Sequence, residues 1–157
     1  MDGPCHAYGL HQAFERELGR VWRLGRSKLY AQLKQLAQAG QVTAQTEVQA
    51  NRPPRQVYQL TPAGREAFLE WLHQPTPHLR HVRLEFLARL YFFRRLGLEG
   101  LEALVARQKA LLQARITAFD AAAADSDDEF ERLVFTFRQG QMAAVIDWLE
   151  QCREASS

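Results

Sequence analysis

The sequence predicts a mainly α-helical protein with one small β-hairpin, and three observations lead to this fold class. Apolar residues recur at helical spacing, as at Leu29, Leu33 and Leu36, which follow i, i+4 and i+7. Residues 42–49 and 56–60 are rich in strand formers and flank a short turn that contains proline. The chain has 157 residues and 46% hydrophobic content, which is enough to bury a core. The sequence therefore predicts a folded chain rather than a disordered one.

The first half of the chain is organised around a helix between Gly25 and Gly40. Its apolar stripe packs inward, and its other faces carry hydrogen-bond donors without a carboxylate. We expect a helix over residues 5–18 before it, and a one-rung strand at residues 21–24. A hairpin follows, with two prolines that bar ladder pairing at its tip, and Thr61 then caps a helix that reaches Leu72. A helix followed by a basic hairpin is the layout of a winged helix.

The second half of the chain is predicted to be wholly helical, with about three helices. Residues 84–96 are apolar on nearly every side, and residues 101–119 carry two apolar seams at seven-residue spacing. Ser126 to Glu129 form a capping box that opens the last helix. Such seams require a partner helix, so we expect a symmetric dimer. The residues expected at its interface are Leu104, Val105, Leu111, Leu112, Phe119, Phe137, Val145 and Trp148.

Positive charge is concentrated in the first half of the chain. Residues 20–55 hold seven basic residues and one acid, Glu47, which gives +6, whereas residues 75–157 hold eleven basic and twelve acidic residues, which gives −1. A local excess of this kind suits a polyanionic partner. A solvated basic surface is the alternative, and the placement of the cations on one helix and one hairpin tip favours the polyanion.

Several function classes are excluded by the sequence. No apolar run is long enough for a membrane span and no signal peptide is present, so we expect a soluble cytoplasmic protein without a membrane partner. The two cysteines suggest neither a disulfide nor a zinc site. Ser27 has no histidine and aspartate at a suggestive spacing, which argues against an enzyme. His78, His81 and Glu85 share a helix face, but incidental histidines in a linker are the preferred interpretation, so no metal or cofactor is expected.

These motifs together resemble the PadR family of transcriptional regulators. The matching residues are Leu29-Tyr30, Leu33, Leu36, Gly40 and Val42, then Arg52-Pro53-Pro54-Arg55 with Tyr58, then Thr61 with Gly64-Arg65, and earlier Gly3-Pro4 with His6 and Tyr8. The resemblance is strong over residues 3–73 and weaker over the helical tail. It implies a DNA-binding winged helix in residues 1–74 and a helical dimerisation region in residues 75–157.

Three departures from the family pattern bear on these expectations. Gly25-Arg26-Ser27-Lys28 replaces the usual Ser-Pro-Gly-Thr start of the recognition helix, which adds two cations and implies a different target sequence. Ala7 stands where the family usually has glycine. An apolar first helix, which the resemblance places before Gly3, has no counterpart here. A late start, a truncation and a genuine departure are all compatible with the sequence.

The resemblance and the side-chain chemistry together assign candidate DNA contacts. Arginine and lysine at the start of a recognition helix can donate to guanine O6 and N7, and glutamine can both donate to and accept from adenine. The remaining candidates are expected to contact phosphates or the minor groove and to position the helix. The complete set is Arg26, Ser27, Lys28, Tyr30, Gln32, Lys34, Arg52 and Arg55.

The aromatic residues of the second half suggest a further hypothesis. Tyr91, Phe92, Phe93 and Trp148 could line a pocket for a planar effector, although core packing is the default for an aromatic stripe. The resemblance implies that some relatives release DNA on binding small aromatic molecules. The predicted function is therefore a homodimeric repressor of operator DNA with a possible small aromatic effector. A protein-binding winged helix and an aromatic-binding helical dimer without DNA affinity are the alternatives.

Overall fold

The computed structural model describes residues 3–49 and 52–154, and it leaves the side chains of residues 49, 52, 53 and 154 undescribed. The chain divides into two compact units, Met1–Glu70 and Trp71–Ser157. Each unit is described by itself. The division falls within helix α3, close to the proline-bounded segment where the sequence analysis placed its boundary.

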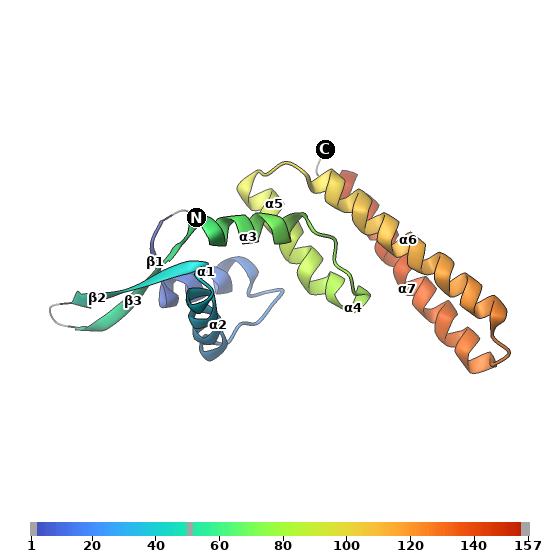
Figure 1. Ribbon diagram of the computed structural model, residues 1–157, viewed down its shortest axis with the longest axis horizontal. Coiled ribbons are helices and arrows are strands. Elements are labelled where there is room, and N and C mark those ends of the chain that lie inside the picture. Colours follow the sequence, from blue (N-terminus) through green and yellow to red (C-terminus); the bar gives the residue numbers. More distant parts are fainter. Residues whose placement is uncertain (1–2, 50–51, 155–157) are drawn as a thin grey trace. The chain divides into compact units, whose positions relative to one another are not determined.

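The first unit combines two helices, a three-stranded sheet and most of α3 (Figure 1). Its elements are β1 (Cys5–His6), α1 (Ala7–Leu18), α2 (Arg26–Gln38), β2 (Val42–Gln49), β3 (Arg52–Leu60) and α3 (Pro62–His73). The sheet is antiparallel with the order β1-β3-β2. These elements confirm the predicted winged helix-turn-helix.

The structure corrects the prediction of the third strand. Cys5 and His6, which were expected to open the first helix, pair with Tyr58 and Val57 of β3 instead. Residues 21–24, which were expected to form that strand, lie in a turn and an irregular connection. The reason is that residues 5 and 6 reach the free edge of β3 directly, so the segment after α1 is left to connect two helices.

The hairpin is longer than predicted. Strand β3 begins at Arg52 rather than at Gln56, and Arg55 pairs with Glu47. The pairing then shifts, so that Gln49 lies opposite Arg52 and the two prolines have no partner in the ladder. A proline has no N–H to donate, so the strand continues past both residues only because the register shifts there.

The core of the first unit lies between α1, α2 and the sheet. Ala7, Leu29, Leu33 and Tyr58 are buried there, and three further apolar side chains pack against them: Leu10, Leu24 and Val42. Full burial of one leucine contributes about 1.5–3 kcal/mol. Leu29 and Leu33 therefore fix which face of α2 points inward, and the opposite face is left to solvent.

The second unit is helical, as predicted. Its elements are the end of α3, the short α4 (Leu79–His81), the π-helical turn η1 (Val82–Phe86), α5 (Leu87–Leu96), α6 (Leu101–Asp125) and α7 (Glu129–Glu154). The helices α6 and α7 run antiparallel and side by side as a long hairpin (Figure 1). Helix α7 begins two positions later than the predicted capping box implies, because Asp128 rather than Ser126 is its N-cap and accepts from the Phe130 N–H at 2.8 Å.

The two seams of α6 find most of their partners inside the same chain. Leu104, Val105 and Leu112 are at most 2% exposed, and Met142 and Leu149 of α7 are equally buried. Phe119 stacks on Phe135 of α7 with ring centroids 5.6 Å apart. The seams therefore build an intramolecular hairpin, and the prediction that they require a second copy does not follow from them.

Candidate nucleic-acid interface

Helix α2 presents a polar face with donors and no carboxylate. Ser27, Ala31 and Lys34 lie one above another on the side opposite the buried leucines, flanked by Lys28 and Gln35, and all five are exposed. Gln32 is also exposed, and its amide donates to Gln35 Oε1 at 3.0 Å. This face can offer cationic and amide hydrogen bonds to an acceptor-rich surface.

Two side chains border this face on the side of α1. Tyr30 is 49% exposed, and the Arg26 guanidinium lies over the Tyr8 ring at 5.6 Å from its centroid. Gln12 in turn donates to the Tyr8 hydroxyl at 3.0 Å. A cation held over an aromatic ring gains about 0.5–1 kcal/mol at an exposed site, so Arg26 is positioned at the start of α2 rather than free to sample solvent.

The end of α2 is joined to the base of the hairpin by close backbone packing. Gly40 has φ +70, which closes the helix in the left-handed conformation that glycine favours. The Thr61 hydroxyl lies 2.8 Å from Gly40 O and 3.0 Å from Gln41 O, and it also accepts from the Gly64 N–H. A Cβ at Gly64 would collide with the Gln41 carbonyl. The hairpin is therefore anchored to α2 and to the start of α3.

The wing carries one ion pair near its tip. Arg55 Nε donates to Glu47 Oε2 at 2.8 Å, and both side chains are about half exposed. The hydrogen bond and the charge of Arg55 lower the pKa of the Glu47 carboxyl, so Glu47 stays ionised near neutral pH. Arg52 lies at the start of β3, and its side chain is outside the described part of the chain. Glu47 is the one acid of residues 20–55, and it offsets part of the wing's positive charge.

The predicted interface residues of the second unit fall into three groups. Leu104, Val105 and Leu112 are buried within the chain, and Leu111 and Phe119 are half-buried. Phe137 is 65% exposed and shares a face of α7 with Phe130 and Leu133, which are also exposed. Val145 and Trp148 line an open groove. Among the eight predicted interface residues, Phe137 is thus the one that lies on an exposed apolar face, together with Phe130 and Leu133.

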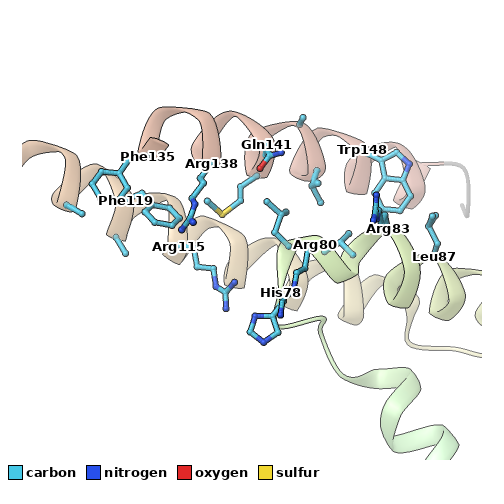
Figure 2. A pocket seen from close by; sticks show the side chains of 17 residues that line it. His78, Arg80, Arg83, Leu87, Arg115, Phe119, Phe135, Arg138, Gln141 and Trp148 are labelled. Atoms are coloured by element: carbon cyan, nitrogen blue, oxygen red, sulfur yellow. The ribbon is translucent and has the colours of Figure 1, made fainter. Parts of the chain in front are cut away.

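That groove has a volume of about 1330 Å³ and lies between the α4–η1–α5 segment and the α6–α7 hairpin (Figure 2). Of the four residues predicted to line an effector pocket, the structure places Trp148 on it, where the indole packs against Phe86 at 5.8 Å. Tyr91, Phe92 and Phe93 do not line it. Tyr91 contacts Phe92, and Phe93 is buried against His73. The aromatic side chains of α5 therefore pack against one another and against His73, which agrees with core packing as the default for an aromatic stripe.

A buried polar cluster in the second unit was missed by sequence reasoning. Arg89 is 2% exposed, donates to Trp71 O at 2.9 Å and to Thr76 Oγ1 at 2.6 Å, and lies over the Trp71 ring. Gln108 accepts from the Thr76 N–H at 2.6 Å and donates to Thr76 O at 3.1 Å. Burial lowers the pKa of Arg89, and Glu85 at 3.4 Å opposes that shift. The cluster fixes the segment after α3.

The described residues offer no metal site and no membrane span. No group of three or more histidine, cysteine, aspartate or glutamate side chains gathers in residues 3–49 and 52–154 in a way that could hold a metal ion. His81 Nδ1 and Glu85 Oε1 lie 3.3 Å apart, while the His78 ring meets the His81 ring edge to face. In the same described ranges, no helix has the length and apolar character needed to cross a bilayer.

A winged helix whose second helix and wing expose cations is the class of protein that residues 3–73 define. Comparison with known families agrees. Residues 1–70 match the transcriptional regulator PadR-like family, and residues 82–156 match the family described as virulence activator alpha C-term. The chain belongs to the PadR-like family of transcriptional regulators. This is not a family of enzymes.

Two curated relatives have similar sequences. The negative transcriptional regulator PadR of Bacillus subtilis is 31% identical over 117 residues, which cover 73% of this chain and 63% of the relative. The chain thus spans slightly less than two thirds of that relative. The probable transcriptional regulator Rv1176c of Mycobacterium tuberculosis is 25% identical over 166 residues, which cover 94% of this chain and 88% of the relative.

Solved structures of similar proteins include Bacillus subtilis PadR in complex with operator DNA. The protein in this structure is 25% identical to the chain. The match covers 95% of this chain and 88% of that protein, with a TM-score of 0.46. The same protein in complex with p-coumaric acid is 24% identical. The match covers 99% of this chain and 92% of that protein, with a TM-score of 0.42.

Proposed function

We propose that this protein is a homodimeric repressor that binds operator DNA through α2 and the wing. The observation that carries the proposal is the exposed face of α2, which presents Ser27, Lys28 and Lys34 with no carboxylate, beside a wing that adds Arg55. The 31% identical relative is named a negative transcriptional regulator, and its structure with operator DNA supports the same activity here.

The residues take different roles in this proposal. Arg26, Ser27 and Lys28 lie in the first turn of α2, the part of a recognition helix that contacts base edges in the major groove. Arg and Lys there donate to guanine, and Gln32 is suited to adenine. Tyr30, Lys34, Arg52 and Arg55 contact phosphates or the minor groove and set the register.

The homodimer is proposed to form through α7. Phe130, Leu133 and Phe137 lie on one face at spacings of three and four residues and are 71%, 63% and 65% exposed. Three large apolar side chains in one row on a helix are unfavourable in water and typical of an interface. A two-fold pairing through this row would present two winged helices to two half-sites of a palindrome.

A small aromatic effector that controls DNA binding is part of the proposal. The structure of Bacillus subtilis PadR with p-coumaric acid supports the idea, and Trp148 on the groove supplies an optical signal for it. Quenching of tryptophan fluorescence by aromatic acids tests this part. Binding of an aromatic acid without any change in DNA affinity would leave an aromatic-binding helical dimer as the better description.

DNA binding is tested by fluorescence anisotropy with a labelled duplex from upstream of the protein's own gene. We expect tight, salt-dependent binding that the double variant Lys28→Ala/Arg55→Ala weakens by at least tenfold, with a salt slope lower by about 0.9, because Arg55 is the member of the pair that contacts a phosphate. Arg94→Ala/Arg95→Ala in the second unit is the matched control and should bind as the wild type does. Equal binding by both double variants would favour a winged helix that recognises a protein.

A further inference from the structure

We propose that the groove of the second unit is a binding site for an extended anionic amphipath, namely a long acyl chain that ends in a carboxylate. The site consists of residues of α4, η1, α5, α6 and α7 that all belong to one compact unit. The proposal goes beyond DNA binding and does not depend on it, because the groove and the α2–wing surface share no residue. It names an acyl carboxylate, in place of a small aromatic acid, as the ligand of the groove that Trp148 lines.

The shape of the groove favours a long ligand. Its α7 wall runs from Phe135 to Trp148, thirteen residues further along the helix, which corresponds to about 20 Å at 1.5 Å per residue. Its volume of about 1330 Å³ exceeds the range of about 300–1,000 Å³ that is usual for ligand pockets. A single-ring acid would fill only a small part of this space and would leave most of the apolar wall in water.

The walls of the groove are apolar along its length. Figure 2 shows Phe119 and Phe135 towards one end, and Leu87 and Trp148 towards the other. Val82, Met142 and Val145 also line the groove. Burial of an apolar chain on such a surface contributes about 0.8 kcal/mol per methylene group. On a continuous apolar wall the binding free energy therefore increases with the length of the ligand.

The charged side chains of the lining are all arginines, and the other polar residues are Gln141 and His78. Arg80, Arg83, Arg115 and Arg138 border the groove together with His78, and the lining contains no aspartate or glutamate. Among the described residues, no carboxylate lies within ion-pair distance of Arg83, Arg115 or Arg138. Arg138 lies over the Phe119 ring at 5.6 Å. Glu85, an acid of η1, is engaged by His81 and Arg89 instead.

Two of these arginines are placed to hold the carboxylate. Arg115 of α6 is half-buried, and Arg138 of α7 lies over the Phe119 ring; both line the groove, near the end that Phe119 and Phe135 occupy in Figure 2. A half-buried guanidinium without a counter-ion gains from an anion, and a planar guanidinium can hold a carboxylate through two parallel hydrogen bonds. We therefore place the carboxylate between Arg115 and Arg138 and the acyl chain along Met142 and Val145 towards Trp148.

The test compares cis-parinaric acid, a fluorescent fatty acid, with its uncharged methyl ester, both below their micelle concentrations and with the full-length protein. We expect the acid to bind at least tenfold more tightly than the ester, as a charge-assisted contact should provide. In Arg115→Gln/Arg138→Gln this preference should disappear while the ester binds as before. Arg132→Gln, an exposed arginine of α7 outside the groove, is the matched control and should keep the preference.

Four results would overturn the proposal. Equal affinity for the acid and the ester would remove the anionic requirement, and retention of the preference in the Arg115→Gln/Arg138→Gln variant would place it elsewhere. Displacement of the probe by p-coumarate as effectively as by oleate would remove the requirement for length. The last is a dimer that does not bind the probe and that Val145→Glu dissociates in sedimentation velocity, because a second copy of the chain would then occupy the groove. DNA binding, measured on the same samples, shows separately whether the proposed regulator function holds.

Discussion

Replacement of Glu47 by glutamine should make DNA binding tighter and more dependent on salt. In the structure the Glu47 carboxylate accepts from Arg55 Nε at 2.8 Å, so the wing's acid competes with DNA phosphate for the wing's cation. Glutamine keeps the size and polarity of the side chain but removes its charge. The variant therefore releases Arg55 to a phosphate and also removes a negative charge that repels DNA.

The magnitude of this effect follows from counterion release. In the wild type we expect Arg55 to be shared between Glu47 and a phosphate, so its release adds at most ~0.9 to the salt slope. The loss of affinity between 50 mM and 200 mM salt should therefore grow by up to about 3.5-fold relative to the wild type. Anisotropy titrations at four salt concentrations measure this slope. The partner variant Arg55→Ala should show a slope lower than that of the wild type. If Glu47→Gln bound more weakly or with an unchanged slope, the wing would not contact the phosphate backbone.

The effect of Glu47→Gln should also be constant between pH 6 and 8, because Arg55 lowers the pKa of Glu47 and the carboxylate loses its charge only below its ordinary range. Gln108→Leu should destabilise the protein by about 2–4 kcal/mol in urea unfolding followed by circular dichroism, since it leaves the buried N–H and C=O of Thr76 unpaired. The exposed Gln113→Leu should change stability by less than about 0.5 kcal/mol. Phe137→Glu should weaken the proposed dimer by about thirtyfold or more in sedimentation velocity, because Phe137 lies in the exposed apolar row of α7. The control Thr136→Glu should leave the dimer unchanged. A dimer that Phe137→Glu does not affect would contradict pairing through α7.

The helices and the hairpin were predictable because their signals are local. The period of Leu29, Leu33 and Leu36 specifies α2 from within one segment, and the Thr61-Pro62 pair marks the start of α3, where the Thr61 hydroxyl does accept from the Gly64 N–H. The third strand was not predictable in this way. Cys5 and His6 form a strand only because the edge of β3, some fifty residues later, is there to pair with them.

The second unit shows a similar limit for side chains. The seams of α6 predicted a partner helix correctly, but periodicity does not distinguish a helix of the same chain from one of another copy. Arg89 and the groove arginines gave no local signal, since the second half is balanced in charge and each cation looks like a solvated surface residue. Their roles depend on which helices come together, since Arg89 contacts Thr76 and Trp71, and since Arg115 of α6 and Arg138 of α7 line the same groove.

The most direct test of the central proposal is selection of bound duplexes from a random library, carried out with the wild type, Lys28→Ala and Arg55→Ala. A homodimer that reads bases with the start of α2 should enrich a palindrome whose half-sites are about one helical turn apart. Lys28→Ala should then change the preferred base at one position of each half-site, and Arg55→Ala should keep the same motif at lower affinity. Enrichment of no motif, or of a motif that Lys28→Ala leaves unchanged, would contradict sequence-specific recognition by α2.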